Sequence, residues 1–415
     1  MAILPIAAAI AALATAQQPA TTATWELLDL PAAAGSLAPR IGVLDDRVLV
    51  SWLEPAEGEG RFALRAADLA GGVARPLAAP AVVADDLFVN WADTPGVVPA
   101  PGGALVAHWL QELGGDNYAY GVQLARSTDG GESWEPLGSL HADQQAVEHG
   151  FASFAPGPSG LTAVWLDGHG TAAEVGDGVA KGADEHGHDG RGAMTLHTAH
   201  VSDGVRQELE LDADVCDCCP TSIVATPAGP VVAYRDRVPG EELRDIAVVR
   251  WLGDRWSDPA LVHADGWVVA GCPVNGPVLA ARGQQVALAW FTAADRPAIK
   301  VALSADGGQS FGPPREAFVS SPGSLALGRV ALEFDAGGAL HLVHLVQSGG
   351  SAELIHQARE PGGRWSEPQA ILESSPTRRS GVPVLRRTGD RLLLATTSVG
   401  SEGRTQVQLR SLRAD

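Results

Sequence analysis

Leu105-Val106-Ala107-His108-Trp109 is one of seven short apolar segments that recur along the chain, most of them ending in a large side chain. Their last residues are separated by 57, 56, 69, 56, 54 and 52 positions. A period near 55 residues, with β-type alternation and no clear helical pattern, predicts a β-propeller. The other six segments are residues 48–52, 161–165, 231–234, 286–290, 340–344 and 392–396.

The number of repeats predicts an all-β chain that forms a single seven-bladed propeller over residues 17–415, with six blades as the alternative. The seventh unit supplies only three strands, whereas residues 25–30, Trp-Glu-Leu-Leu-Asp-Leu, form a strand without a unit. We expect this N-terminal strand to complete the last blade, because a ring closed by both termini leaves no open sheet edge. The longest interval holds a Gly-, Asp- and His-rich insertion at about 168–192, which we interpret as a loop.

Charge and the first residues indicate where the protein acts. The net charge of −20 opposes binding to nucleic acid and to anionic membrane surfaces. No later apolar run reaches the roughly 18 residues of a membrane-spanning helix. Residues 1–16 form an Ala-rich apolar stretch that ends Ala14-Thr15-Ala16, which is typical of a secretory signal peptide. We therefore expect a secreted or periplasmic protein, acting as a monomer.

Two turns carry the same motif at matching points of the repeat. Residues 127–134 read Ser-Thr-Asp-Gly-Gly-Glu-Ser-Trp, and residues 304–311 read Ser-Ala-Asp-Gly-Gly-Gln-Ser-Phe. The Ser and Asp side chains are suited to bonding turn amides, and the glycines to positive φ. The motif predicts structural turns rather than a catalytic site. Its key residues are Ser127, Asp129, Gly131 and Trp134 in the first copy and Ser304, Asp306, Gly308 and Phe311 in the second.

These motifs resemble the Asp-box (BNR) repeats of the sialidase/neuraminidase-like propellers, and the likeness extends over the whole expected domain. The resemblance implies an exo-α-sialidase-like protein with an arginine trio, an acid/base Asp and a Tyr–Glu nucleophile pair whose Tyr lies in the last blades. Here the only tyrosines are Tyr118, Tyr120 and Tyr234. Whether the protein is an enzyme therefore stays open at this point, since a fold alone does not carry function.

All four cysteines belong to one pair of motifs, Cys216-Asp217-Cys218-Cys219-Pro220 and Gly271-Cys272-Pro273. Cys216 and Cys272 occupy the same position of neighbouring units, 18 residues before the ends of their second strands. This equivalence predicts that the cysteines meet on one face of the ring, beside its axis. His149 lies near the equivalent position of the third unit and is a further candidate ligand.

Two interpretations of the cysteines remain. Four thiolates from two loops are suited to a soft or borderline ion, Cu(I) or Zn(II). Disulfides are the alternative, although a bridge within the 216–219 cluster would be strained.

Polar side chains near the cysteines suggest a ligand site on the same face. Arginine presents a planar fork to carboxylate or phosphate groups, and an Arg–Asp network that braces the loop is the alternative. The candidate ligand-binding residues are Arg235, Asp236, Arg237 and Asn275, and the candidate glycosidase carboxylates are Asp93, Glu148, Asp217 and Asp236.

Two functions follow from the sequence. One is a metal-binding propeller. The other is an exo-α-sialidase, a related glycoside hydrolase or a glycan-binding protein, so the expected partners are a metal, a glycan or another small molecule.

Overall fold

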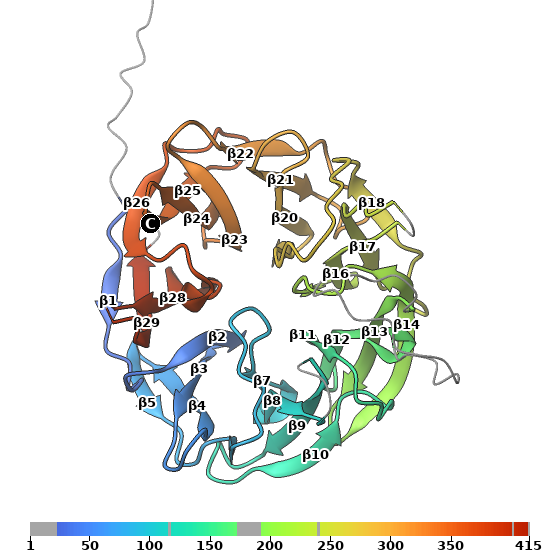
Figure 1. The fold of residues 1–415 in the computed structure, drawn as a ribbon, viewed down its shortest axis with the longest axis vertical. Helices are drawn as coiled ribbons and strands as arrows, with labels where there is room; N and C mark the ends of the chain where they lie inside the picture. Colours follow the sequence, from blue (N-terminus) through green and yellow to red (C-terminus); the bar gives the residue numbers. More distant parts are fainter. Residues whose placement is uncertain (1–22, 115–117, 172–191, 239–240, 401, 414–415) are drawn as a thin grey trace, which may run out of the picture.

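The structure is a computed structural model, and it describes residues 23–114, 118–171, 192–238, 241–400 and 402–413. Seven antiparallel sheets stand around a common axis, like the blades of a propeller (Figure 1). The predicted all-β, seven-bladed ring is confirmed, and the six-bladed alternative is wrong. The expected signal peptide, residues 1–16, lies outside the described residues, as does most of the His-rich insertion.

Each blade except the last is built from consecutive strands, with the innermost strand first. Blade one consists of β2 (Leu37–Leu44), β3 (Arg47–Pro55), β4 (Phe62–Ala70) and β5 (Val73–Pro76), with β6 (Val82–Ala84) also paired to β4. Blade two consists of β7 (Gly96–Pro99), β8 (Leu105–Glu112), β9 (Tyr120–Ser127) and β10 (Glu135–Ser139). Blade three consists of β11 (His149–Pro156), β12 (Leu161–Asp167), β13 (Met194–Val201) and β14 (Val205–Val215).

The next three blades repeat this plan. Blade four consists of β15 (Ser222–Thr226), β16 (Gly229–Arg235), β17 (Ile246–Arg250) and β18 (Ala260–His263). Blade five consists of β19 (Val278–Arg282), β20 (Gln285–Thr292), β21 (Ala298–Ser304) and β22 (Arg315–Val319). Blade six consists of β23 (Leu325–Phe334), β24 (Leu340–Ser348), β25 (Ser351–Arg359) and β26 (Gln369–Ser374).

The last blade joins the two ends of the chain. Its inner strands are β27 (Val384–Thr388), β28 (Arg391–Val399) and β29 (Thr405–Arg413), and its outer strand is the N-terminal β1 (Glu26–Leu28). β1 pairs antiparallel with β29, Leu28 opposite Leu409. The predicted closure of the ring is therefore confirmed, although the strand is shorter than the segment 25–30.

The core lies between neighbouring blades and consists mainly of Leu, Val and Ala side chains. Trp52, Trp165 and Trp290, on the second strands β3, β12 and β20, are fully buried in it. Trp165 packs with Tyr120 of the preceding blade. Within the described residues the helical segments are the short 3-10 turns Pro101–Gly103, His169–Thr171 and Arg378–Ser380, and none of them has the length and apolar character needed to cross a lipid bilayer.

The two turns that resemble Asp-boxes have the hydrogen bonds expected from their sequence. Ser127 Oγ accepts a hydrogen bond from the Gly131 amide at 2.8 Å, and Asp129 Oδ1 accepts one from the Ser133 amide at 3.0 Å. The second turn repeats both bonds at 2.9 Å. The residues that carry them there are Ser304, Asp306, Gly308 and Ser310. These motifs therefore stabilise hairpins.

Candidate functional site

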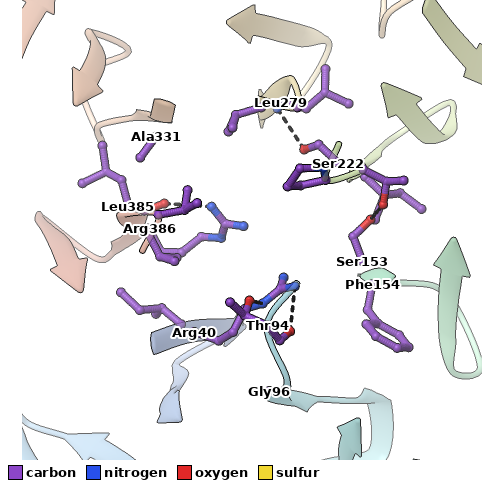
Figure 2. A pocket seen from close by; sticks show the side chains of 18 of the residues that line it. Arg40, Thr94, Gly96, Ser153, Phe154, Ser222, Leu279, Ala331, Leu385 and Arg386 are labelled. Carbon is purple, nitrogen blue, oxygen red and sulfur yellow. Dashed lines mark hydrogen bonds between the residues drawn. The ribbon is translucent and has the colours of Figure 1, made fainter. Parts of the chain in front are cut away.

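A central cavity of about 380 Å³ is lined by the innermost strands of all seven blades. Figure 2 shows part of this lining, in which Arg40 and Arg386 extend toward the axis and Ser153 and Ser222 lie on the opposite wall. Arg40 bonds Thr94 of the next blade through Nε at 2.8 Å. The lining includes residues 220–222 and 274–276, which come shortly after the two cysteine motifs. The two cysteine motifs are therefore continuous in sequence with segments that line the cavity.

Three thiols meet in the loop that connects β14 to β15. The Sγ atom of Cys216 is 3.4 Å from that of Cys219 and 3.9 Å from that of Cys218. All three side chains are buried, and the Cys216 amide donates to the Arg235 carbonyl of β16 at 3.0 Å. The cluster is thus fixed to blade four at the point where its inner strand begins, and it could hold a metal ion.

The fourth thiol comes from the neighbouring blade. Cys272 lies between β18 and β19, and its sulfur, the Cys218 sulfur and an Asp217 carboxylate oxygen all lie within 4.8 Å of one another. All four cysteines are free thiols, and Cys272 is the exposed one. The predicted convergence of the two motifs is therefore present, and the disulfide alternative is absent from this structure.

A buried arginine lies against the thiols. Arg244 Nη1 donates to Cys216 Sγ at 3.1 Å and to Asp217 Oδ1 at 3.2 Å, while its Nη2 donates to Glu242 Oε2 at 2.8 Å. One positive charge is therefore shared between two carboxylates and a sulfur, which favours the thiolate form of that sulfur.

The thiols differ in acidity because of this arrangement. Burial raises the pKa of the Cys216 thiol, but its hydrogen bonding with Cys218 and Cys219, together with Arg244, holds that pKa well below its usual range. Hydrogen bonding with Cys216 raises the pKa of Cys218, and burial raises that of Cys219. Hydrogen bonding with Cys218 lowers the pKa of Cys272. Cys216 and Cys272 are therefore the sulfurs that ionise first.

Two of the residues predicted to bind a ligand lie in the framework between blades. Arg235 is buried and donates to the carbonyls of Arg244, Asn275 and Phe291, at 2.6, 2.8 and 2.9 Å. Asn275 accepts from the Arg329 amide at 2.9 Å. Arg235 therefore braces the loops around the cysteines, which was the alternative to ligand binding, because its N–H groups donate to main-chain carbonyls.

The other two residues of that prediction lie at the edge of the same loop. Arg237 Nη2 donates to Glu242 Oε1 at 3.0 Å. Asp236 accepts from the Arg237 amide at 2.8 Å, and burial, with the nearby Asp212, raises the pKa of Asp236 to about 6. Arg237 thus shares Glu242 with the arginine that touches Cys216.

His149 lies in a different group of potential ligands from the thiols. It is fully buried, with Nδ1 3.1 Å from Asp167 Oδ2 and Nε2 3.2 Å from Asp143 Oδ2. Its ring stacks on that of His141 with centroids 3.8 Å apart. The expected link between His149 and the cysteines stays a prediction.

Two of the predicted carboxylates meet at a tyrosine. Tyr120 Oη lies 3.0 Å from Asp93 Oδ2 and 2.8 Å from Glu148 Oε1. The hydroxyl has one proton, so one of these contacts requires a proton on a carboxyl group. Burial raises the pKa of Asp93 to about 6 and that of Glu148 well above its usual range, with Asp93, Asp217 and Cys272 adding to the shift of Glu148. Glu148 is thus the acid that stays protonated.

Two of these residues carry only a weak signal in the sequence. Tyr120 is one of three tyrosines, but its pairing with Asp93 and Glu148 depends on a strand register that spacing does not reveal. Arg244 lies in the charged run 241–245, where nothing in the sequence marks which arginine turns inward.

No protein-family model matches the chain, and no curated protein is similar to it in sequence. Solved structures do resemble it. An ancestral GH74 enzyme has a TM-score of 0.54 at 12% sequence identity, and the match covers 95% of this chain and 52% of the enzyme's chain. The polysaccharide lyase Uly1 has a TM-score of 0.52 at 10% sequence identity, and the match covers 97% of this chain and 94% of the lyase. Trypanosoma rangeli sialidase is less similar, with a TM-score of 0.46 at 12% sequence identity. That match covers 82% of this chain and 56% of the sialidase.

At these identities the first two likenesses show the fold. The chain is a β-propeller of the architecture that these carbohydrate-active proteins share. The identity of any ligand has to be argued from the side chains of this chain.

Proposed function

We propose that this protein binds a soft or borderline metal ion, Cu(I) or Zn(II), through Cys216, Cys218, Cys219 and Cys272. The observation that carries the proposal is the distance between sulfurs, 3.4 and 3.9 Å within the buried cluster. A tetrahedral ion with metal–sulfur bonds of about 2.3 Å places neighbouring sulfurs roughly 3.8 Å apart. The thiols are thus close to the spacing that a shared ion requires.

The setting of the thiols supports the same function. Three ligands come from one loop of blade four and the fourth from blade five, so an ion would join two blades. Arg244 would offset part of the negative charge of a four-thiolate site, because it already touches Cys216 and Asp217. Ligand binding to the folded state alone should then raise the melting temperature.

Metal analysis of the full chain, purified with its thiols reduced, tests the proposal. The thiol site should take up about one equivalent of Zn(II), or one or more of Cu(I), and should release protons as the thiols ionise. Cys272→Ser should weaken binding more than replacement of any one clustered cysteine, because it removes the only ligand from blade five. His263→Ala serves as the control and should leave the amount of bound metal unchanged, because His263 is partly exposed and belongs to no potential metal group among the described residues.

Two disulfides in the native protein, found by mass spectrometry without reduction, together with no stoichiometric metal, would refute the metal function. The cysteines would then be a structural clasp between blades four and five.

A glycan is the second candidate ligand, favoured by the group of Tyr120, Asp93 and Glu148 near the thiols. Glu148 is half-buried and held protonated, which suits a general acid, and Tyr120 connects it to Asp93. The proteins of similar fold named a polysaccharide lyase and a GH74 enzyme add support by analogy.

Turnover assays separate this function from metal binding. With no late-blade tyrosine, hydrolysis of an activated sialoside should stay at background. If acidic polysaccharides or other glycosides are cleaved, Glu148→Gln should abolish turnover, and Glu132→Gln, in the first Asp-box turn, should not. Equal activity of both variants would exclude Glu148 as the acid.

The proposed location follows from the first sixteen residues, which are expected to direct export. In an oxidising compartment free thiols are readily lost, and a bound ion would protect them. N-terminal sequencing of the protein recovered from a periplasmic fraction tests the location, since a mature chain should begin near Gln17.

A further inference from the structure

A second group of metal-ligating side chains lies on blade three and shares no residue with the thiols. β12 ends at Asp167, and the short turn His169–Thr171 follows at once. His197 lies on the neighbouring strand β13, opposite Trp165. One potential ligand atom from each of Asp167, His169 and His197 lies within 4.8 Å of the other two.

His197 is held in the form that can bind a metal. Its Nδ1 lies 3.0 Å from Glu208 Oε1 on β14, so this nitrogen carries the proton and donates it to the carboxylate. Nε2 then keeps its lone pair. That atom is buried and makes no hydrogen bond, and Glu210 Oε2 is 3.9 Å away. A carboxylate behind one ring nitrogen and a free lone pair on the other is the usual arrangement of a metal-binding histidine.

The carboxylate of the group is equally well placed. Asp167 is fully buried, and its Oδ2 accepts from Trp165 Nε1 at 2.9 Å. Its Oδ1 faces His169, 2.8 Å from Nδ1. An ion at this point would take the place of the proton between Oδ1 and Nδ1. His169 is 38% exposed in its side chain, so an ion could reach the site from solvent.

We propose that Asp167, His169 and His197, with Glu208 orienting His197, form a site for a divalent ion of the Zn(II) type. Two imidazoles and one carboxylate are the ligand set of zinc sites that leave a fourth position open for water or substrate. The nitrogen and oxygen ligands distinguish it from the thiol cluster, which favours softer ions. The proposal does not depend on the function assigned to the cysteines.

Metal titration of the reduced full chain tests the second site. With Zn(II), His197→Ala should bind one equivalent less than the unchanged protein. His200→Ala is the matched control, because His200 lies on the same strand and belongs to no potential metal group among the described residues. With Co(II), the ion that His197→Ala loses should lack thiolate-to-metal charge-transfer absorption, which distinguishes it from an ion at the cysteines.

A surface variant keeps the test decisive if His197→Ala does not fold. His169→Ala changes a partly exposed turn and should weaken Zn(II) binding at this site at least tenfold, and Glu208→Gln should weaken it about 10- to 100-fold. Equal stoichiometry and affinity of His169→Ala and His200→Ala would overturn the proposal. So would a lost Co(II) ion that carries thiolate absorption.

Discussion

Arg244 Nη1 lies 3.1 Å from the sulfur of Cys216, and both side chains are buried. The same guanidinium also contacts Asp217 and Glu242. A cation held in this way favours a charged sulfur at neutral pH. It also ties the thiol cluster to the loop that follows β16.

Replacement of Arg244 should therefore make the thiols less acidic. In Arg244→Gln, we expect the pKa of the Cys216 thiol to rise, so that alkylation of the metal-free protein at pH 7 becomes slower. The measurement is the rate of thiol alkylation between pH 5 and 9, followed by mass spectrometry of the 216–219 peptide.

Arg237→Gln is the control for this experiment. Arg237 shares Glu242 with Arg244 but its hydrogen bonds go to that carboxylate rather than to sulfur. Its replacement should leave the alkylation profile unchanged. If both variants shift the profile equally, the effect belongs to the loop as a whole and not to the Arg244–Cys216 contact.

Removal of residues 25–30 should strongly destabilise the ring. These residues include β1, whose pairing with β29 completes blade seven and covers its edge. Thermal unfolding should occur at a markedly lower temperature than in a chain that begins at residue 23. An unchanged melting temperature would mean that the strand pairing contributes little.

The Asp-box serines should matter for stability and not for metal binding. Ser127→Ala or Ser304→Ala leaves the amide of Gly131 or Gly308 without its partner, at a cost of roughly 1–3 kcal/mol. Ser202→Ala, in the turn between β13 and β14 of blade three, should cost less, because Ser202 Oγ donates to the exposed Asp203 carboxylate and not to a buried partner. Chemical denaturation measures the cost, and metal content should be equal in all three variants.

The propeller could be predicted because its repeat is written in local patterns. Seven apolar segments, which end in residues such as Trp52 and Trp290, recur with a period near 55 residues that is typical of a propeller. Residues 25–30 form a strand outside these units, and the last unit lacks one strand, so the two could be matched. The cysteine cluster was also predictable, since Cys216 and Cys272 occupy equivalent positions of neighbouring blades.

The details of the sites were not predictable from spacing. Tyr120 begins β9 and reaches Asp93 and Glu148 only through the packing of blade two on blade three. Arg235 looked suited to an external anion, but its donors are used by carbonyls of two blades. Which charged side chains turn inward depends on loop geometry, and that geometry is set by tertiary contacts.

Asp93 provides a prediction about pH. Burial raises its pKa from an ordinary 3.8 to about 6, so between these values the folded protein binds a proton that the unfolded chain releases. The free energy of unfolding contributed by this group is therefore highest below pH 4, falls as the pH rises to about 6, and is constant above that. The total loss is on the order of 3 kcal/mol.

Asp93→Asn removes this charge at every pH. Its amide could still serve the Phe151 N–H and the Tyr120 hydroxyl, which now contact Asp93 at 2.7 and 3.0 Å. Relative to the unchanged protein, the variant should gain stability steadily from pH 4 to 6 and keep that gain at pH 7, as measured by urea denaturation. Asp203→Asn should instead lower stability by an amount that is nearly constant from pH 4 to 7, because the hydrogen bond from Arg206 lowers the pKa of Asp203 below its ordinary 3.8 and this group titrates below that range. A stability difference for Asp93→Asn that is flat, or that declines over this range, would show that the buried carboxyl is ionised in the folded protein at pH 4 and does not hold a proton beside Tyr120.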